Sequence, residues 1–132
     1  MFELSQEFHF DAAHTLHRPG VDPQEMHASL RIHGHSYTAT VTLRGERDSG
    51  GMLLDLGVLR RCIERVRARL DHHHLDHVEG LGPATLENLC VFIHQHLHQE
   101  LQAAVGDAGA QALCRVAVRR PTTGDACVYT PG

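Results

Sequence analysis

The segment HGHSYTATVTLR, residues 33–44, alternates between apolar and polar side chains, which is the period of a half-buried β-strand. The apolar positions are Tyr37, Ala39, Val41 and Leu43. His33 and His35 begin the segment two residues apart, so their side chains leave the same face of the strand, roughly 6 to 7 Å apart at the root. Gly34 between them leaves the opposite face open to close approach by backbone or ligand. The segment therefore predicts a strand that starts with two convergent imidazoles.

Three other segments also have strand character, and two have the period of a helix. The predicted strands are residues 2–12, with apolar residues at most even positions, residues 113–120, and residues 126–130. One amphipathic helix follows the capping residue Asp55. Its apolar positions are Leu56, Leu59, Ile63, Val66 and Leu70. A second helix follows Thr85 and ends at VGDAG, residues 105–109.

The order of these elements is β-β-α-α-β-β, which predicts a single α+β domain over residues 1–132. Strands followed by helices and then strands favour a four-stranded antiparallel sheet with two helices on one face. Residues 17–29, HRPGVDPQEMHAS, contain two prolines and a glycine and are too long for a hairpin turn. We expect this segment to be a functional or mobile loop.

Composition excludes several classes of protein. The net charge of −4 and the absence of a basic cluster argue against nucleic-acid binding. No basic leader or run of roughly 20 apolar residues is present, so we expect a soluble cytoplasmic protein without membrane contact. The four cysteines lack CxxC spacing and are expected to be buried free thiols.

A third histidine favours a metal site over two surface histidines. His14 ends the first predicted strand and would lie beside the start of the second if these strands pair antiparallel. An exposed HxH pair is common in a chain with 13 histidines, but three convergent imidazoles with an open fourth position are typical of catalytic zinc. We therefore predict Zn²⁺ bound by His14, His33 and His35.

At this point the sequence resembles the family of 6-pyruvoyl-tetrahydropterin and 6-carboxytetrahydropterin synthases. The resemblance is carried, in the family's order and approximate spacing, by FDAAHTL, HGHSY, LDHHHLD, PATLENL and the terminal CVY. It implies a tunnelling fold, in which sheets of several subunits join into a barrel, with two trimers stacked as a homohexamer. It also implies that His14, His33 and His35 are the zinc ligands.

The resemblance further implies lyase chemistry on a pterin, 7,8-dihydroneopterin triphosphate, in a queuosine-type or other pterin pathway. Zinc would polarise oxygens of the pterin side chain while an Asp71 and His72 relay moves a carbon-bound proton. Thr85 and Glu87 correspond to a stretch near the family's substrate pocket. Glu87 could accept hydrogen bonds from the amino group and ring N–H of the pterin. Alternatively, its negative charge stabilises the first turn of its helix.

Two family residues are missing from this sequence. The loop before HGH has no cysteine to act as base or nucleophile; Ser29 and His27 stand at the two positions where family branches place it, and Glu25 is nearby. The glutamate that anchors the pterin before the last strand is also absent. Arg120 lies in or near its position, and Asp125 is the only carboxylate nearby. Either Asp125 or Glu87 therefore takes over the binding of the pterin ring, or the ligand is not an ordinary pterin.

Three functions remain open from the sequence. The first is a lyase of the 6-carboxytetrahydropterin synthase type, with His27, Glu25 or the Asp71 and His72 pair as base. The second is 6-pyruvoyl-type or other side-chain chemistry on a related pterin. The third is a zinc-binding paralogue without turnover.

Overall fold

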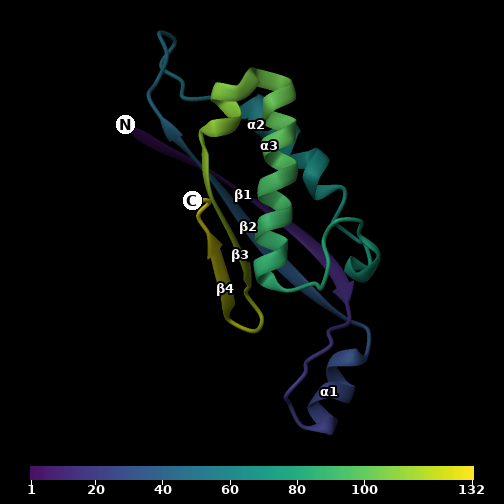
Figure 1. Ribbon diagram of the computed structural model, residues 1–132. Coiled ribbons are helices and arrows are strands. Elements are labelled where there is room, and N and C mark those ends of the chain that lie inside the picture. Colours follow the sequence, from purple (N-terminus) through teal and green to yellow (C-terminus); the bar gives the residue numbers. More distant parts are fainter.

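A single antiparallel sheet is the frame of the molecule, and the computed structural model describes it over residues 1–132 (Figure 1). Its strands lie in chain order and are β1 (Phe2–His14), β2 (His33–Gly45), β3 (Leu113–Arg120) and β4 (Asp125–Tyr129). The helices are α1 (Pro23–Leu30), α2 (Leu56–Arg67), the 3₁₀ turn η1 (Leu75–His77) and α3 (Leu86–Gln111). The predicted strand and helix order is confirmed, with α1 as an additional helix.

The two long helices begin at the predicted residues and cover one face of the sheet. Asp55 accepts hydrogen bonds from the backbone N–H groups of Gly57 and Val58, and Thr85 accepts one from Asn88. Both side chains satisfy donors that the first helical turn leaves unpaired. α2 packs on β1, and α3 packs on β3 and β4 (Figure 1).

α1 forms in the segment that we expected to be a loop. Asp22 accepts from the backbone N–H groups of Gln24 and Glu25, and Pro23 occupies the first helical turn, where its missing N–H costs nothing. The Asp-Pro pair was therefore a helix signal within the polar segment. α1 lies beyond the end of the sheet, at the bottom of Figure 1, and the backbone N–H of Leu16 donates to the Ser29 carbonyl at 2.8 Å.

α3 is interrupted within the VGDAG segment, as its composition indicated, but helical residues resume beyond it. Gly106 has φ 82° and ψ −176°, which a residue with a side chain rarely adopts. Helical residues continue to Gln111. The sequence therefore predicted the interruption at Gly106 but not the helical residues that follow it.

The core lies between the sheet and the long helices. Phe10 and Tyr37, on neighbouring strands, stack with ring centroids 4.8 Å apart. The apolar positions of the predicted strands and helices supply most of the core; those with an exposed fraction of 1% or less include Phe10, Tyr37, Ala39, Val41, Leu43, Leu59, Val66, Leu89, Ile93, Leu97, Leu101, Val116 and Val118. Cys62 and Cys90 are buried free thiols, whereas Cys114 and Cys127 are half-buried.

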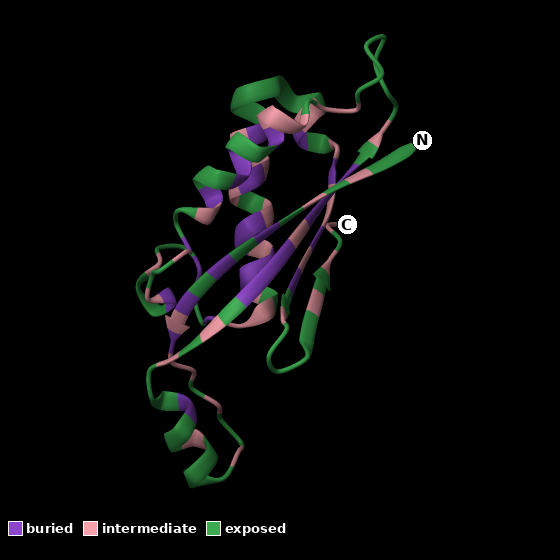
Figure 2. Cartoon of the chain, turned by 180° about the vertical axis from the view of Figure 1, so that it is seen from behind, coloured by how far each residue is buried: buried purple, intermediate pink, exposed green.

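The other face of the sheet is polar and carries no helix of this chain (Figure 2). Ion pairs and hydroxyl hydrogen bonds connect its strands: Arg115 lies 3.2 Å from Glu3, and Ser5 and Thr42 are hydrogen-bonded at 3.0 Å. None of the helices has the length and apolar character that crossing a membrane requires.

Candidate metal centre

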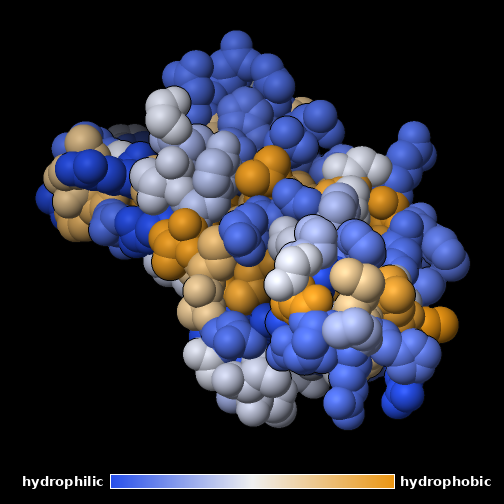
Figure 3. Space-filling model, turned by 60° about the horizontal axis from the view of Figure 1, so that its bottom comes forward, coloured by the Kyte–Doolittle hydropathy of each residue, from blue (hydrophilic) through white to orange (hydrophobic).

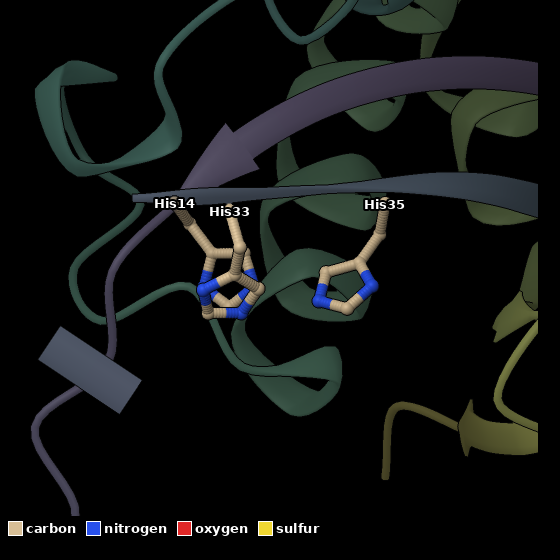
Figure 4. Close-up of side chains that lie close together, drawn as sticks. All are labelled: His14, His33 and His35. Carbon is tan, nitrogen blue, oxygen red and sulfur yellow. The ribbon is translucent and has the colours of Figure 1, made fainter. Parts of the chain in front are cut away.

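The strand register brings the three predicted metal ligands together at one end of the sheet. His14 is paired with His33 across β1 and β2, and His35 stands opposite Ala12 on the same face. The ring centroids lie 4.4 Å apart for His14 and His33 and 5.0 Å apart for the other two pairs. In Figure 4 the three rings hang from the same side of the strands. One nitrogen from each ring lies within 4.8 Å of the others.

Backbone carbonyls orient two of the rings. Nδ1 of His14 lies 3.2 Å from the Thr15 carbonyl, and Nδ1 of His33 lies 2.9 Å from the Arg31 carbonyl. Since a carbonyl only accepts, we assign the proton to Nδ1 in both rings, which leaves each Nε2 with a free lone pair. Nε2 of His14 and Nε2 of His35 are buried and have no hydrogen-bond partner. Such unpaired nitrogens fit a metal ion that takes imidazole ligands.

Burial favours the neutral form of His14 and His35, which is the form that binds metal. It lowers the pKa of His14, and it lowers the pKa of His35 to about 4, with a further contribution from the positive charge of Arg120. At neutral pH, His14 and His35 therefore present lone pairs rather than protons.

The three imidazoles line a cavity of about 250 Å³ between the sheet end and α1. Its other lining residues are Leu16, Arg18, Ser29, Arg120, Thr123 and Asp125. In Figure 3, which brings the end of the molecule that carries α1 forward, apolar residues appear in small groups among hydrophilic ones. The surroundings of the cavity are thus those of a site for a polar ligand rather than of a broad apolar interface.

Comparison with known proteins assigns the family. The family model described as 6-pyruvoyl tetrahydropterin synthase matches residues 3–132. The chain belongs to this family. A 6-pyruvoyl tetrahydrobiopterin synthase of Drosophila melanogaster is 36% identical over 113 residues, covering 75% of this chain and 66% of that protein. The 6-carboxy-5,6,7,8-tetrahydropterin synthase of Bacillus subtilis is 29% identical over 133 residues, covering 98% and 86%.

The fold is likewise that of the 6-pyruvoyl tetrahydropterin synthase family. The structure of the Caenorhabditis elegans 6-pyruvoyl tetrahydropterin synthase superposes with a TM-score of 0.81 at 24% identity, over 99% of this chain and 96% of that one. The Plasmodium vivax enzyme superposes with a TM-score of 0.70 at 17% identity, over 98% of each chain. The predicted family and fold are confirmed.

Among the residues considered in place of the family's loop cysteine, only Ser29 lines the histidine cavity. Its side chain is largely buried, and its hydroxyl accepts a hydrogen bond from Nη1 of Arg18 at 3.2 Å. His27 and Glu25 are exposed on α1 and are not among the lining residues. A carboxylate oxygen of Glu25 lies 3.8 Å from Arg18.

Asp71 and His72 are adjacent but are not hydrogen-bonded to each other. Asp71 accepts from the backbone N–H of Asp11 at 2.9 Å and pairs with Arg67 at 3.0 Å. His72 Nε2 lies 3.9 Å from Asp71 Oδ1, and its side chain is 79% exposed. The backbone of His72 has φ 58°, which is uncommon for a residue other than glycine. The relay geometry would need a rotation of the His72 side chain.

A second cavity, of about 590 Å³, is lined by His72 but not by Asp71. Its lining also includes His35 and, from the strands, Asp11 and Ser36. Asp11 and Ser36 leave the sheet on the face opposite to the three histidines, so this cavity lies mainly across the sheet from the metal ligands.

The remaining predicted substrate residues are divided between two places. Asp125 lines the histidine cavity, where it pairs with Arg120 at 2.8 Å and accepts from the Thr123 hydroxyl at 2.7 Å. Thr85 caps α3 and Glu87 is exposed in its first turn, and neither lines that cavity. For Glu87, the alternative role of favouring the first turn of α3 matches this position.

Sequence reasoning missed two residues of this region. Arg18 lies in the expected loop, and its place in the cavity wall depends on the fold of α1. Asp76 accepts hydrogen bonds from the backbone N–H and the hydroxyl of Thr15, whose carbonyl faces His14. Asp76 stands in the LDHHHLD motif, which was the available signal, but only the folded chain relates it to His14.

Proposed function

We propose that this protein is a zinc-dependent pterin lyase of the 6-carboxy-5,6,7,8-tetrahydropterin synthase type. The proposed substrate is 7,8-dihydroneopterin triphosphate, in a queuosine-type pathway. The observation that carries the proposal is the convergence of three imidazoles in one cavity, two of which, His14 and His35, have a buried and unpaired Nε2. The Bacillus subtilis relative, which aligns with 98% of this chain, supports the choice of branch.

His14, His33 and His35 would hold the metal through their Nε2 atoms and leave a coordination position open toward the cavity. Bound zinc supplies Lewis acidity, which makes a proton next to a carbonyl or hydroxyl carbon easier to remove. The cavity wall would then orient the pterin side chain. The chain must also provide a proton acceptor.

The chain offers more than one candidate for the proton acceptor. His72 lines the neighbouring cavity, and Ser29 lines the metal cavity itself. Variants of the Plasmodium vivax relative that replace a glutamate are described as catalytic residue mutants, so a carboxylate serves catalysis in that protein. By analogy, Glu25 would act if α1 turned it toward the cavity. We favour Asp71 and His72, because a carboxylate beside an imidazole is an acid-base pair without further rearrangement of α1.

The proposal is tested by incubating zinc-restored protein with 7,8-dihydroneopterin triphosphate and following pterin products and acetaldehyde. We expect a carboxylated tetrahydropterin with acetaldehyde release. A pyruvoyl product without acetaldehyde would instead assign the 6-pyruvoyl tetrahydropterin synthase reaction, to which the Drosophila melanogaster relative's name points. No product above a metal-free control would contradict both reactions.

A second candidate, a metal-binding paralogue without turnover, is favoured by one observation. The cavity wall contains no thiol, and its one carboxylate, Asp125, is paired with Arg120. The absence of product in the assay above would support this candidate. Ser29→Cys tests the position of the missing base, because Arg18 beside a thiol at this position would favour the reactive thiolate. A gain in rate of about tenfold or more would place residue 29 at the position of the family's base. An unchanged rate would favour the alternative alignment, in which His27 stands at the position of the family's cysteine.

A further inference from the structure

The polar wall of the histidine cavity carries more positive than negative charge. Arg18 and Arg120 line it, while Asp125 is its one carboxylate. Nη2 of Arg120 lies 2.8 Å from the Asp125 carboxylate. Nε of Arg120 is buried and has no hydrogen-bond partner. Arginine carries five N–H donors and no acceptor, so the donors of Arg120 that Asp125 does not use are available to an acceptor from outside the chain.

Arg120 is built into the fold rather than lying loosely on the surface. Its side chain is 23% exposed, and it projects from the end of β3 on the face that carries Tyr37. The buried Tyr37 hydroxyl also has no hydrogen-bond partner. Asp125 compensates the charge of Arg120 on one side, and an anion at the remaining donors would add to that compensation.

Arg18 approaches the same cavity from the other side. Its Nη1 donates to the Ser29 hydroxyl at 3.2 Å, which fixes the guanidinium against α1. Its contact with Glu25 is longer, at 3.8 Å, and Glu25 does not line the cavity. Two arginines therefore border a space of about 250 Å³ that also contains the three imidazoles.

We propose that Arg120 and Arg18 form an anion-binding subsite beside the three histidines, which takes a carboxylate or phosphate group of the substrate. This subsite rests on the proposed pterin function and specifies its substrate class: a pterin whose anionic group lies next to the metal centre. Arginine binds such groups through parallel, charge-assisted hydrogen bonds, and a neutral hydroxyl cannot use both donors equally well.

Arg119 provides a matched control for Arg120. It is the preceding residue on β3, but its side chain leaves the opposite face of the sheet, where it lies 3.9 Å from Glu7. Arg119→Gln thus removes the same charge from the same strand without changing the cavity wall. Arg120→Lys keeps the positive charge and reports whether a loss in Arg120→Gln is due to charge or to folding.

The first experiment tests the subsite without a pterin. Metal-free protein is titrated with inorganic phosphate at constant ionic strength, and thermal unfolding is followed. We expect phosphate to raise the unfolding midpoint of the wild type and of Arg119→Gln, but not that of Arg120→Gln. An equal rise in all three proteins would overturn the subsite, whatever the outcome with pterins.

The second experiment uses two pairs of pterins on metal-free and zinc-loaded protein. Because the chain has no tryptophan, pterin fluorescence can be followed directly. We expect pterin-6-carboxylate to bind about tenfold or more tightly than 6-hydroxymethylpterin, or dihydroneopterin triphosphate than dihydroneopterin, in both forms of the protein. The pair that shows the preference identifies the anionic group as carboxylate or phosphate.

The outcomes separate the subsite from the function on which it rests. Loss of the preference in Arg120→Gln and Arg18→Gln, with neutral pterins bound as before and Arg120→Lys retaining most of it, supports the subsite. Equal binding of anionic and neutral pterins by the wild type overturns the subsite and leaves the pterin function in place. Failure of every pterin to bind overturns the proposed function, and the phosphate titration then decides the subsite alone.

Discussion

At the scale of single residues, the position of hydrogen atoms on three imidazoles determines what this site can bind. His14 and His33 face backbone carbonyls through Nδ1, so both rings present Nε2 to the cavity. Nε2 of His35 is buried and unpaired. The spacing of His33 and His35 on one strand was readable in the sequence, because side chains two apart share a face. The contribution of His14 depended on strand pairing.

The first prediction concerns metal content. Purified protein should contain about one zinc per chain, and His33→Ala should lose most of it, because two imidazoles hold zinc far more weakly than three. Metal analysis after dialysis against a weak chelator measures this. His98→Ala is the control, since His98 lies on α3 beside His94 and outside the cavity. Full zinc in the His33→Ala protein would contradict the site.

The second prediction concerns Asp76, which acts on the metal centre through Thr15. Its carboxylate holds the Thr15 backbone N–H at 3.1 Å, and the Thr15 carbonyl faces Nδ1 of His14. Asp76→Asn should weaken zinc binding about tenfold, as is usual when a supporting contact of a metal ligand is lost. Competition with a chromogenic chelator gives the affinity. Asp48→Asn, which removes a carboxylate that accepts backbone hydrogen bonds in the distant loop between β2 and α2, should leave the affinity unchanged.

At the scale of elements, Asp71 joins the end of α2 to β1. Its carboxylate accepts from the Asp11 backbone N–H and pairs with Arg67, which itself donates to the His9 carbonyl. The hydrogen bond from Asp11, followed by the charge of Arg67, holds the pKa of Asp71 below its ordinary value. Because the folded chain favours the ionised form, this group stabilises the fold above the ordinary pKa and loses its contribution as the pH falls through the lowered value.

The third prediction follows from the lowered pKa of Asp71. Asp71→Asn should lower the free energy of unfolding by about 1 to 2 kcal/mol near neutral pH, since hydrogen bonds to a charged group are lost. The difference from wild type should shrink as the pH falls below about 4. Urea unfolding at several pH values tests this. A difference that stays constant from neutral to strongly acidic pH would show that the charge of Asp71 is not responsible.

The helices illustrate which elements a sequence predicts well. α2 and α3 carry an apolar face at helical spacing and begin at capping residues, so local signals and burial agree. α1 has one largely buried residue, Ser29, and its pattern therefore had no apolar face to reveal it. The capping residue Asp22 and the following Pro23 were the local signal for this helix. Pro19 and Gly20 in the same segment indicated a loop instead.

At the scale of the whole molecule, the polar face of the sheet and its edge strand β4 are not covered by this chain (Figure 2). An uncovered edge offers unpaired N–H and C=O groups to another copy. We therefore propose, as the family resemblance implies, that the protein forms a homohexamer. The edge strand β4 carries Val128, an apolar side chain that is 59% exposed.

The fourth prediction is that the wild type has a solution mass of six times 14.6 kDa and that Val128→Lys shifts it toward smaller species. A buried lysine at a strand edge opposes pairing between copies. Sedimentation velocity distinguishes the species. Met52→Lys, at a similarly exposed apolar residue outside the sheet, should keep the wild-type mass. A monomeric wild type, or an unchanged mass in Val128→Lys, would contradict assembly through this edge.

The sequence by itself determined the strands, the two long helices and the pair of histidines on β2, because these depend on periodicity and capping within short segments. Only the tertiary structure decided that His14 completes the set, that Ser29 and not His27 lines the cavity, and that Arg18 and Arg120 border it. These residues come from separate segments, and nothing local fixes the distance between them. Strand register and the placement of α1 bring them to one end of the sheet, and these depend on long-range pairing that no local pattern encodes.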